Sequence, residues 1–237
     1  PWNFPIAIAT GGIAAALATG NRVILKPSSD SVLSAFALCQ CFWNAGISKN
    51  TLQFSPTSGA LASEYLIKNK HVDFVIFTGS EKTAFNILTN RPNLQISAET
   101  GGKDATIVTA LADRDQAVKN VIASAFNNSG QKCSATSLLV LEKEVYEDEN
   151  FKKMLVDATE SLHIGSVWDF QNKIGTLVNL PSGNLLRALE SLDNDEQWLI
   201  KPSYVDNNPY MLKPSIRWGT QKGDFCHMNE LFGPVLS

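Results

Sequence analysis

The chain has 237 residues, of which 44% are hydrophobic and 18% charged, and its formal net charge is −3. This composition is typical of a globular protein with a hydrophobic core, and it offers no basic surface for nucleic acid or an anionic membrane. No apolar run reaches the roughly 18–20 residues that cross a bilayer, and no signal-peptide pattern is visible. We therefore expect no nucleic-acid partner and no transmembrane segment.

The first hundred residues alternate between strand and helix patterns. Short apolar runs predict strands, and longer runs with apolar residues at helical spacing predict helices. The order predicts right-handed crossovers and a parallel sheet, in which the apolar strand at residues 72–79 should be buried on both faces. The predicted strands are 22–27, 51–55, 72–79 and 94–99, and the predicted helices are 29–46, 58–69 and 80–90.

The second half continues as a less regular α/β pattern. The residues from 202 to 214 predict mostly loop, with room for a strand within 210–218. Two glycines in "ETGGK" interrupt the pattern near residues 99–102, which indicates a domain boundary there. The predicted strands are 104–110 and 137–143, and the predicted helices are 113–126, 146–162 and 181–192.

The four cysteines are too few for a disulfide scaffold, and we expect them to be reduced. No pair has Cys-x-x-Cys spacing and only three histidines are present, so we expect no metal site. Reduced thiols indicate a reducing compartment, and we expect a cytoplasmic protein. The chain starts at "PWNFP" and stops at "ELFGPVLS", which indicates a piece of a longer protein, truncated at both ends.

One cysteine, Cys133, lies among small and polar residues in "SGQKCSA", just before an apolar strand. A thiolate nucleophile needs access and a lowered pKa, and this segment supplies Gly130 for close backbone approach and Lys132 for positive charge. An isolated cysteine in such a loop is more often structural. The loop alone therefore leaves both interpretations open.

Two other residues could serve the same chemistry. Glu99 ends an apolar strand before a Gly-Gly turn, where burial would raise its pKa towards that of a general base. Asn3 lies between two prolines, and its amide could donate to a developing oxyanion. The ordinary alternatives are a strand-end glutamate bonded to turn N–H groups and a stiff hydrophobic turn.

Three residues suit a nucleotide. Lys26 follows a strand at the carboxyl edge of the predicted sheet, where ligands of open α/β sheets bind. Gly79 and Ser80 lie between a strand and a helix N-terminus, which suits a pyrophosphate. No GxGxxG motif is present, and a surface lysine is the common alternative for Lys26.

The order of these segments carries more information than any one of them. "PWNFP", "KPS", "FTGS", "ETGGK", "GQKCSA" and "ELFGP" together resemble the aldehyde dehydrogenase superfamily along the whole chain. The resemblance implies part of a Rossmann-like NAD(P)-binding domain at residues 1–99 and part of an α/β catalytic domain at 100–237. It implies that Cys133 attacks an aldehyde, that the Asn3 amide and the Cys133 N–H hold the oxyanion, and that Glu99 activates water to hydrolyse the thioester.

The resemblance also implies a nicotinamide cofactor. Lys26 would contact the adenosine ribose, Ser80 the pyrophosphate, and two residues of "ELFGP" the nicotinamide riboside. Ser29 stands where many NAD-preferring members have a glutamate, so we expect NAD and leave NADP open. The cofactor contacts expected are Lys26, Ser29, Gly79, Ser80, Glu230 and Phe232.

Residues 98–141 and 223–236 are similar to dehydrogenases that oxidise L-glutamate γ-semialdehyde in proline catabolism, especially those fused to proline dehydrogenase in bacteria. Ser134 would then bind the substrate carboxylate. The resemblance implies a homo-oligomeric parent protein and is compatible with a fused proline dehydrogenase domain. The alternatives are a general aldehyde dehydrogenase with another substrate and a non-catalytic protein that retains the fold. A CoA-acylating relative is disfavoured by the presence of Glu99, and the fragment alone is expected to be inactive.

Overall fold

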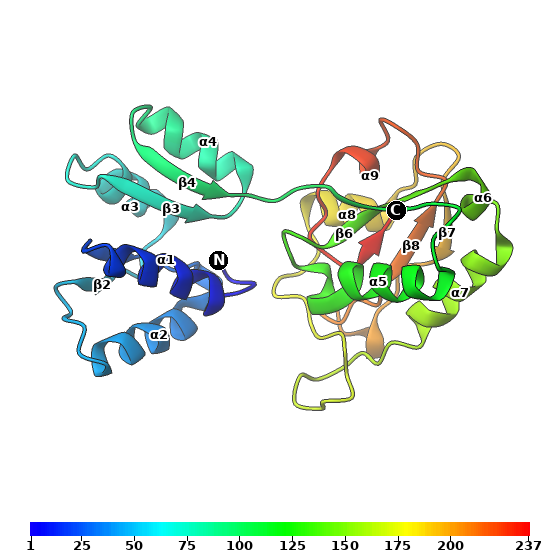
Figure 1. The fold of residues 1–237 in the computed structure, drawn as a ribbon, viewed down its shortest axis with the longest axis horizontal. Coiled ribbons are helices and arrows are strands. Elements are labelled where there is room, and N and C mark those ends of the chain that lie inside the picture. Colours follow the sequence, from blue (N-terminus) through cyan, green and yellow to red (C-terminus); the bar gives the residue numbers. More distant parts are fainter. The chain divides into compact units, whose positions relative to one another are not determined.

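The structure, a computed structural model, describes residues 1–237. It divides into two compact units, an N-terminal unit at Pro1–Gly101 and a C-terminal unit at Gly102–Ser237 (Figure 1). The division falls within the "ETGGK" segment, where the two glycines interrupt the pattern. None of the helices combines the length and the apolar character of a membrane-spanning segment.

The N-terminal unit alternates strands and helices, and its strands pair in parallel as the sequence predicts. The pairs are β1 with β2 and β3 with β4, and they form two separate sheets. The elements are α1 (Ala7–Ala18), β1 (Val23–Leu25), η1 (Ser29–Ser31), α2 (Val32–Asn44), β2 (Leu52–Phe54), α3 (Gly59–Ala62), a π-helix η2 (Ser63–Ile67), β3 (Phe74–Thr78), α4 (Glu81–Asn90) and β4 (Gln95–Glu99).

Helix α1, which the sequence analysis did not predict, packs against both strand pairs. Its alanine-rich sequence favours a helix. Ile13 of α1 is buried with Cys39 of α2 and Leu52 of β2. Gly12, one residue earlier, faces the side chain of Ile76 in β3, which lies 3.5 Å from where a Cβ atom would be.

The prediction that the strand at 72–79 is buried on both faces is wrong. Phe74 and Ile76 of β3 are 50% and 53% exposed. The physical reason is that β3 pairs with β4 alone, and a two-stranded sheet cannot be covered as completely as the centre of a large one.

The C-terminal unit contains a parallel pair, β5 with β6, and a three-stranded sheet in the order β7-β8-β9. β7 runs antiparallel to β8, and β8 runs parallel to β9. The elements are β5 (Asp104–Val108), α5 (Arg114–Phe126), η3 (Asn127–Gly130), β6 (Thr136–Leu141), α6 (Lys143–Tyr146), α7 (Glu149–Glu160), α8 (Gly183–Glu190), β7 (Gln197–Ile200), η4 (Val205–Asn207), β8 (Ser215–Trp218), α9 (Phe225–Met228) and β9 (Val235–Leu236).

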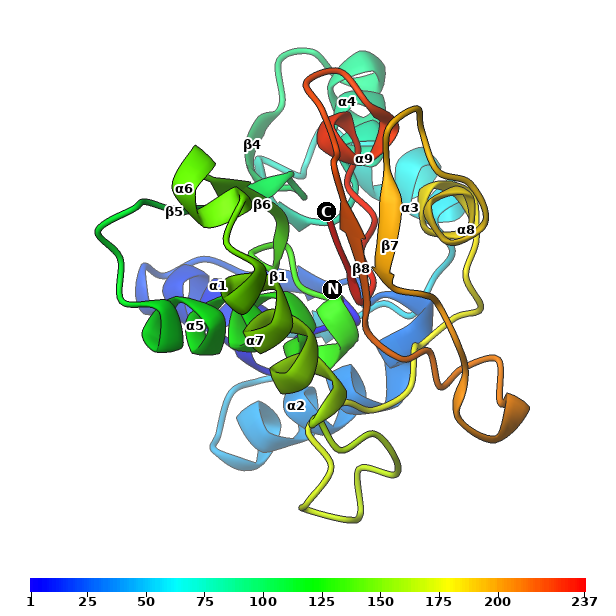
Figure 2. The same ribbon diagram turned by 90° about the vertical axis from the view of Figure 1, so that its right-hand side faces the viewer.

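The last residues of the chain connect these two sheets. Leu139 N donates to Ser237 O at 2.7 Å, and Ser237 N donates to Ser137 O at 3.2 Å. Helices cover the two faces, with α5 and α7 on one side and α8 on the other (Figures 1 and 2). Accordingly, Leu236 packs in the core with α5 and α7, whereas Val235 packs in the core with α8.

Several helix boundaries follow from local capping. Asp113 caps α5 by accepting from Gln116 N at 2.8 Å, which confirms the predicted start of that helix. The helix predicted at 146–162 is confirmed as α7, which starts only at Glu149 because Asp148 caps it by accepting from Asn150 N and Phe151 N. The short helix α6 before it was not predicted. Strands β7 and β9 and the short helix α9 were not predicted. The two strands are defined mainly by their pairing with β8.

Candidate functional site

Cys133 lies in a turn between η3 and β6. Ala135 N donates to Lys132 O at 3.2 Å and closes this turn, and the cysteine is half-buried. Cys39 and Cys226 are completely buried, and burial raises the pKa of each thiol. Cys41 is exposed on α2. Cys133 is therefore the accessible thiol that also lies in a loop before a strand.

The backbone before the turn is strained. Asn128, Ser129 and Gly130 have φ angles of 57°, 55° and 67°, in the left-handed region. A non-glycine residue there costs about 1–3 kcal/mol, and such strain persists where the surroundings impose it. The Ser129 hydroxyl donates to Gly175 O at 2.9 Å and holds one of these residues in place.

Gln131 anchors the N-terminal side of the cysteine turn. Its buried amide nitrogen donates to Asn128 O at 3.2 Å and to Thr176 O at 3.3 Å, and its amide oxygen accepts from Val178 N at 2.9 Å. The sequence analysis assigned no role to Gln131, although it stands two residues before the cysteine in a quoted motif.

Thr136 anchors the C-terminal side of the cysteine turn. Its backbone N–H and its hydroxyl both donate to the Ser124 hydroxyl of α5, at 3.2 and 2.9 Å. The Thr136 hydroxyl also lies 2.7 Å from the Thr106 hydroxyl of β5. The cysteine turn is thus held at both ends by side-chain hydrogen bonds, which pre-organises the thiol.

The "ELFGP" segment packs directly on the cysteine loop. A Cβ atom on Gly130 would lie 2.3 Å from Gly233 O, so the two backbones approach as closely as glycine allows. This confirms the close backbone approach expected at Gly130. Residues from both segments, including Lys132 and Phe232, line a cavity of about 10 Å³.

We expect Gly130→Ala to destabilise the protein more than Gly223→Ala. Gly223 has a φ of 98° but nothing within 4 Å of its Cβ position, whereas Gly130 combines a φ of 67° with the contact to Gly233. Backbone strain alone costs about 1–3 kcal/mol, and the clash adds to it at Gly130 only. Urea unfolding of both variants measures the difference. Equal losses of unfolding free energy would show that the close approach is relieved at little cost.

Glu230 and Phe232 lie in the turn that faces the cysteine loop, and both are half-buried. Glu230 Oε1 accepts from Gly102 N at 3.3 Å, and Glu230 O accepts from Asn184 Nδ2 at 3.2 Å. Phe232 has a positive φ of 57°. The C-terminal unit therefore brings together the predicted nucleophile segment and these two predicted cofactor contacts.

The N-terminal unit places the other predicted cofactor residues after the carboxyl ends of its strands. Lys26 follows β1, where Nζ donates to Pro27 O at 2.9 Å, and Ser29 begins η1 and is exposed. Gly79 and Ser80 are exposed between β3 and α4. The Ser80 hydroxyl caps α4 by accepting from Thr83 N at 3.3 Å.

Glu99 ends β4 beside this loop, because Gly79 N donates to Glu99 O at 3.2 Å. The expected burial of its carboxylate is wrong, since Glu99 is exposed at the end of a strand with a single partner. Asn3 is half-buried in the turn before α1. Asn3 and Glu99 belong to the N-terminal unit, whereas Cys133 and the exposed Ser134 belong to the C-terminal unit.

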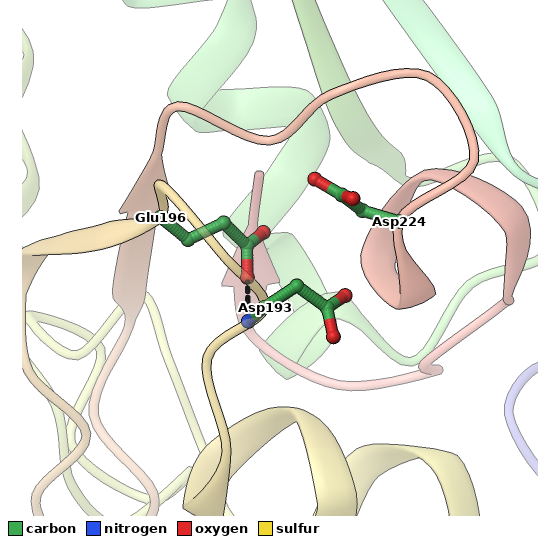
Figure 3. Close-up of side chains that lie close together, drawn as sticks. All are labelled: Asp193, Glu196 and Asp224. Atoms are coloured by element: carbon green, nitrogen blue, oxygen red, sulfur yellow. Dashed lines mark hydrogen bonds between the residues drawn. The ribbon is translucent and has the colours of Figure 1, made fainter.

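An acidic cluster in the C-terminal unit was not predicted (Figure 3). Carboxylate oxygens of Asp193, Glu196 and Asp224 lie within 4.8 Å of one another. Burial alone would raise the pKa of Glu196, but hydrogen bonds from Arg217 and Thr220 hold that pKa below its ordinary value.

Loop contacts account for the other two carboxylates of this cluster. Asp193 Oδ2 accepts from Phe225 N, and Asp224 Oδ2 accepts from Gln221 N, both at 2.6 Å. We therefore interpret the cluster as a support for the loops around β7 and α9.

The fold and the site define a two-unit α/β protein with parallel strand pairs and a pre-organised cysteine turn. The sequence profile of the aldehyde dehydrogenase family matches residues 1–237. The chain therefore belongs to the aldehyde dehydrogenase family, which confirms the resemblance seen in its motifs, and its α/β fold is that of this family.

Individual sequences and structures of this family resemble the chain over its whole length. The chain is 35% identical to 1-pyrroline-5-carboxylate dehydrogenase of Staphylococcus haemolyticus (strain JCSC1435), over 100% of this chain and 47% of that protein. The structure of Proline Utilization A from Corynebacterium freiburgense is 38% identical, with a TM-score of 0.94 over 100% of this chain and 24% of that one. The structure of a Thermus 1-pyrroline-5-carboxylate dehydrogenase with bound NAD is 31% identical, with a TM-score of 0.89 over 100% of this chain and 47% of that one. The chain spans about half the length of the curated relatives it matches.

Proposed function

We propose that the full-length protein oxidises an aldehyde to a carboxylic acid with a nicotinamide cofactor, through a thioester on Cys133. The observation that carries the proposal is the cysteine turn, in which a half-buried thiol lies between two hydrogen-bonded anchors, three residues after Gly130, which packs against Gly233 of the "ELFGP" segment. Family membership supports the same chemistry. In this proposal the N-terminal unit binds the cofactor and the C-terminal unit carries the nucleophile.

Cys133 Sγ attacks the aldehyde carbon, and the carbonyl oxygen becomes an oxyanion. The Cys133 N–H donates to no carbonyl of the chain, and we assign it and the Asn3 amide as the two donors to this oxygen. One such donor contributes on the order of 3 kcal/mol to the transition state. Once the thioester is present, Glu99 removes a proton from water, the water oxygen bonds to the thioester carbon, and the C–S bond breaks to release the acid and the Cys133 thiolate. The exposure of Glu99 leaves it accessible to solvent.

The N-terminal unit has a suitable place for the phosphates of a dinucleotide. The N–H groups of Glu81 and Lys82 open α4 and donate to no carbonyl of the chain, beside the exposed Gly79 and Ser80. A bound nicotinamide would supply the acceptor for the hydride that the aldehyde carbon loses. Lys26 would hold the adenosine ribose, and Glu230 and Phe232 the nicotinamide riboside. We propose NAD as the cofactor. NADP is the alternative, because Ser29 carries no charge that would repel its 2′-phosphate.

We propose L-glutamate γ-semialdehyde as the substrate and L-glutamate as the product. Ser134 is exposed directly after the nucleophile, where its hydroxyl can donate to a substrate carboxylate. The relatives named 1-pyrroline-5-carboxylate dehydrogenase support this choice. The likeness to Proline Utilization A supports a parent that is fused to proline dehydrogenase, and we further propose that it is a cytoplasmic homo-oligomer.

We expect Ser134→Ala in the full-length protein to lower kcat/KM for glutamate γ-semialdehyde by about 10–100-fold, because a hydrogen bond to a charged group is lost. Rates with propanal and hexanal should not change, since these aldehydes lack a carboxylate. Steady-state kinetics with NAD and with NADP measure both effects, and Ser191→Ala is the control, because Ser191 is also exposed.

The unchanged full-length protein tests the proposal itself. Equal or faster oxidation of simple aldehydes would reject the substrate and favour a general aldehyde dehydrogenase. No turnover of any aldehyde with either cofactor would reject the dehydrogenase activity and favour a non-catalytic protein.

A further inference from the structure

Gly102 and Lys103 together contact two other segments of the candidate site. The Lys103 ammonium donates to Ser137 O at 3.0 Å, at the start of β6 and four residues after Cys133. The preceding residue, Gly102, donates its N–H to Glu230 Oε1 at 3.3 Å. Residues 102 and 103 therefore contact both the strand that follows the cysteine turn and the turn that carries Glu230.

The surroundings of Lys103 do not favour a charge. Burial lowers the pKa of Lys103 to about 8. Glu230, Glu196 and the Cys226 thiol favour the charged form, whereas Arg217 opposes it. A charged lysine at this position therefore carries a desolvation penalty.

The hydrogen bond from Lys103 is not needed to satisfy its acceptor. Ser137 O also accepts from the Ser237 N–H at 3.2 Å and from the Ser237 hydroxyl at 3.1 Å. Removal of the ammonium would thus leave no buried carbonyl without a donor, and the usual cost of an unpaired group would not arise. Stability alone gives little reason for a cation here.

We propose that Lys103 is a positioning residue, which fixes the cysteine turn relative to the Glu230–Phe232 turn through its contact with Ser137. Its effect on turnover rests on the proposed function, whereas its effect on the order of the cysteine turn does not. Misplacement of a reacting group by about 1 Å can cost roughly a hundredfold in rate, so a small shift of this turn would be visible in kcat.

The test compares Lys103→Met with Lys119→Met in the full-length protein. Lys119 is exposed on α5, so the control removes a lysine from the same unit without touching the site. For Lys103→Met we expect a Tm equal to or above that of the unchanged protein, faster amide hydrogen exchange confined to residues 131–139, and a kcat reduced by about 10–100-fold. For Lys119→Met we expect none of these changes.

The pH dependence separates the ammonium from the rest of the side chain. The folded pKa of Lys103 is about 8 and its ordinary value is 10.5. Between these values the unfolded state binds more protons, so the unchanged protein gains stability relative to Lys103→Met as pH rises. Below about pH 8 the penalty is fully present, and there the Tm advantage of the variant should be largest. The kcat ratio of the two proteins should shrink above about pH 8, because the ammonium is lost.

Three results would overturn the proposal: unchanged exchange at residues 131–139, a uniform rise in exchange with a lower Tm, or an unchanged kcat in an active enzyme. Hydrogen exchange does not depend on turnover. If the unchanged protein oxidised no aldehyde, the proposed function would fail, and local exchange would still decide the role of Lys103.

Discussion

Replacing Cys133 with alanine should abolish aldehyde oxidation by the full-length protein, with a fall in kcat of roughly 10⁴-fold or more, because the covalent route is lost. Of the remaining cysteines, Cys39 and Cys226 are completely buried, and burial raises the pKa of both thiols. Neither can replace the nucleophile. Steady-state reduction of the nicotinamide cofactor measures the effect.

Cys41→Ala is the matched control, since Cys41 is an exposed cysteine on α2 of the N-terminal unit and is not part of the cysteine turn. We expect its activity to equal that of the unchanged protein. Alkylation with iodoacetamide should inactivate the unchanged protein and Cys41→Ala alike. A Cys133→Ala protein that retained most of its rate would show that no thioester forms at this residue, and would remove the basis of the proposed mechanism.

Replacing Glu99 with glutamine should separate the two halves of the reaction. The amide keeps the size of the side chain but cannot remove a proton from water, so steady-state turnover should fall by roughly 10²–10⁴-fold. Formation of the thioester does not need this base. Rapid mixing should therefore still show one equivalent of reduced cofactor per active site, followed by slow turnover.

Mass spectrometry of intact Glu99→Gln after mixing with substrate should detect the acyl group on the protein. Glu64→Gln is the control, because Glu64 is another exposed glutamate of the N-terminal unit, paired only with Lys68. Loss of the burst together with turnover would place Glu99 before the thioester. Unchanged turnover would mean that another base activates the water.

The features predicted correctly from the sequence depend on neighbours within a few residues. Asp113 and Gln116 are three positions apart, and their hydrogen bond defines the start of α5 wherever the helix later packs. The strand and helix order of the first hundred residues likewise predicted parallel strands, which the pairs β1 with β2 and β3 with β4 confirm, but it predicted one sheet where the structure has two. The glycine at position 130 predicted close backbone approach, although not the segment that approaches it.

The features that were missed or wrong depend on segments far apart in the chain. The exposure of Glu99 follows from the single partner of β4, which no residue near Glu99 indicates. Gln131 gains its role from Val178, 47 positions away, and Lys103 from Ser137, 34 positions away.

The sequence by itself therefore determined the family, the alternation of strands and helices from residue 22 to residue 99, and the position of a cysteine in a loop before a strand. Its motifs are local, and local patterns such as caps, turns and short apolar runs depend on covalent geometry and on nearby hydrogen bonds. Only the tertiary structure decided which side chains hold the cysteine turn, which carboxylates are exposed, and that Lys103 contacts Ser137 while its neighbour Gly102 contacts Glu230. Burial and long-range hydrogen bonds arise when distant segments pack together, and a single sequence does not say which segments those are.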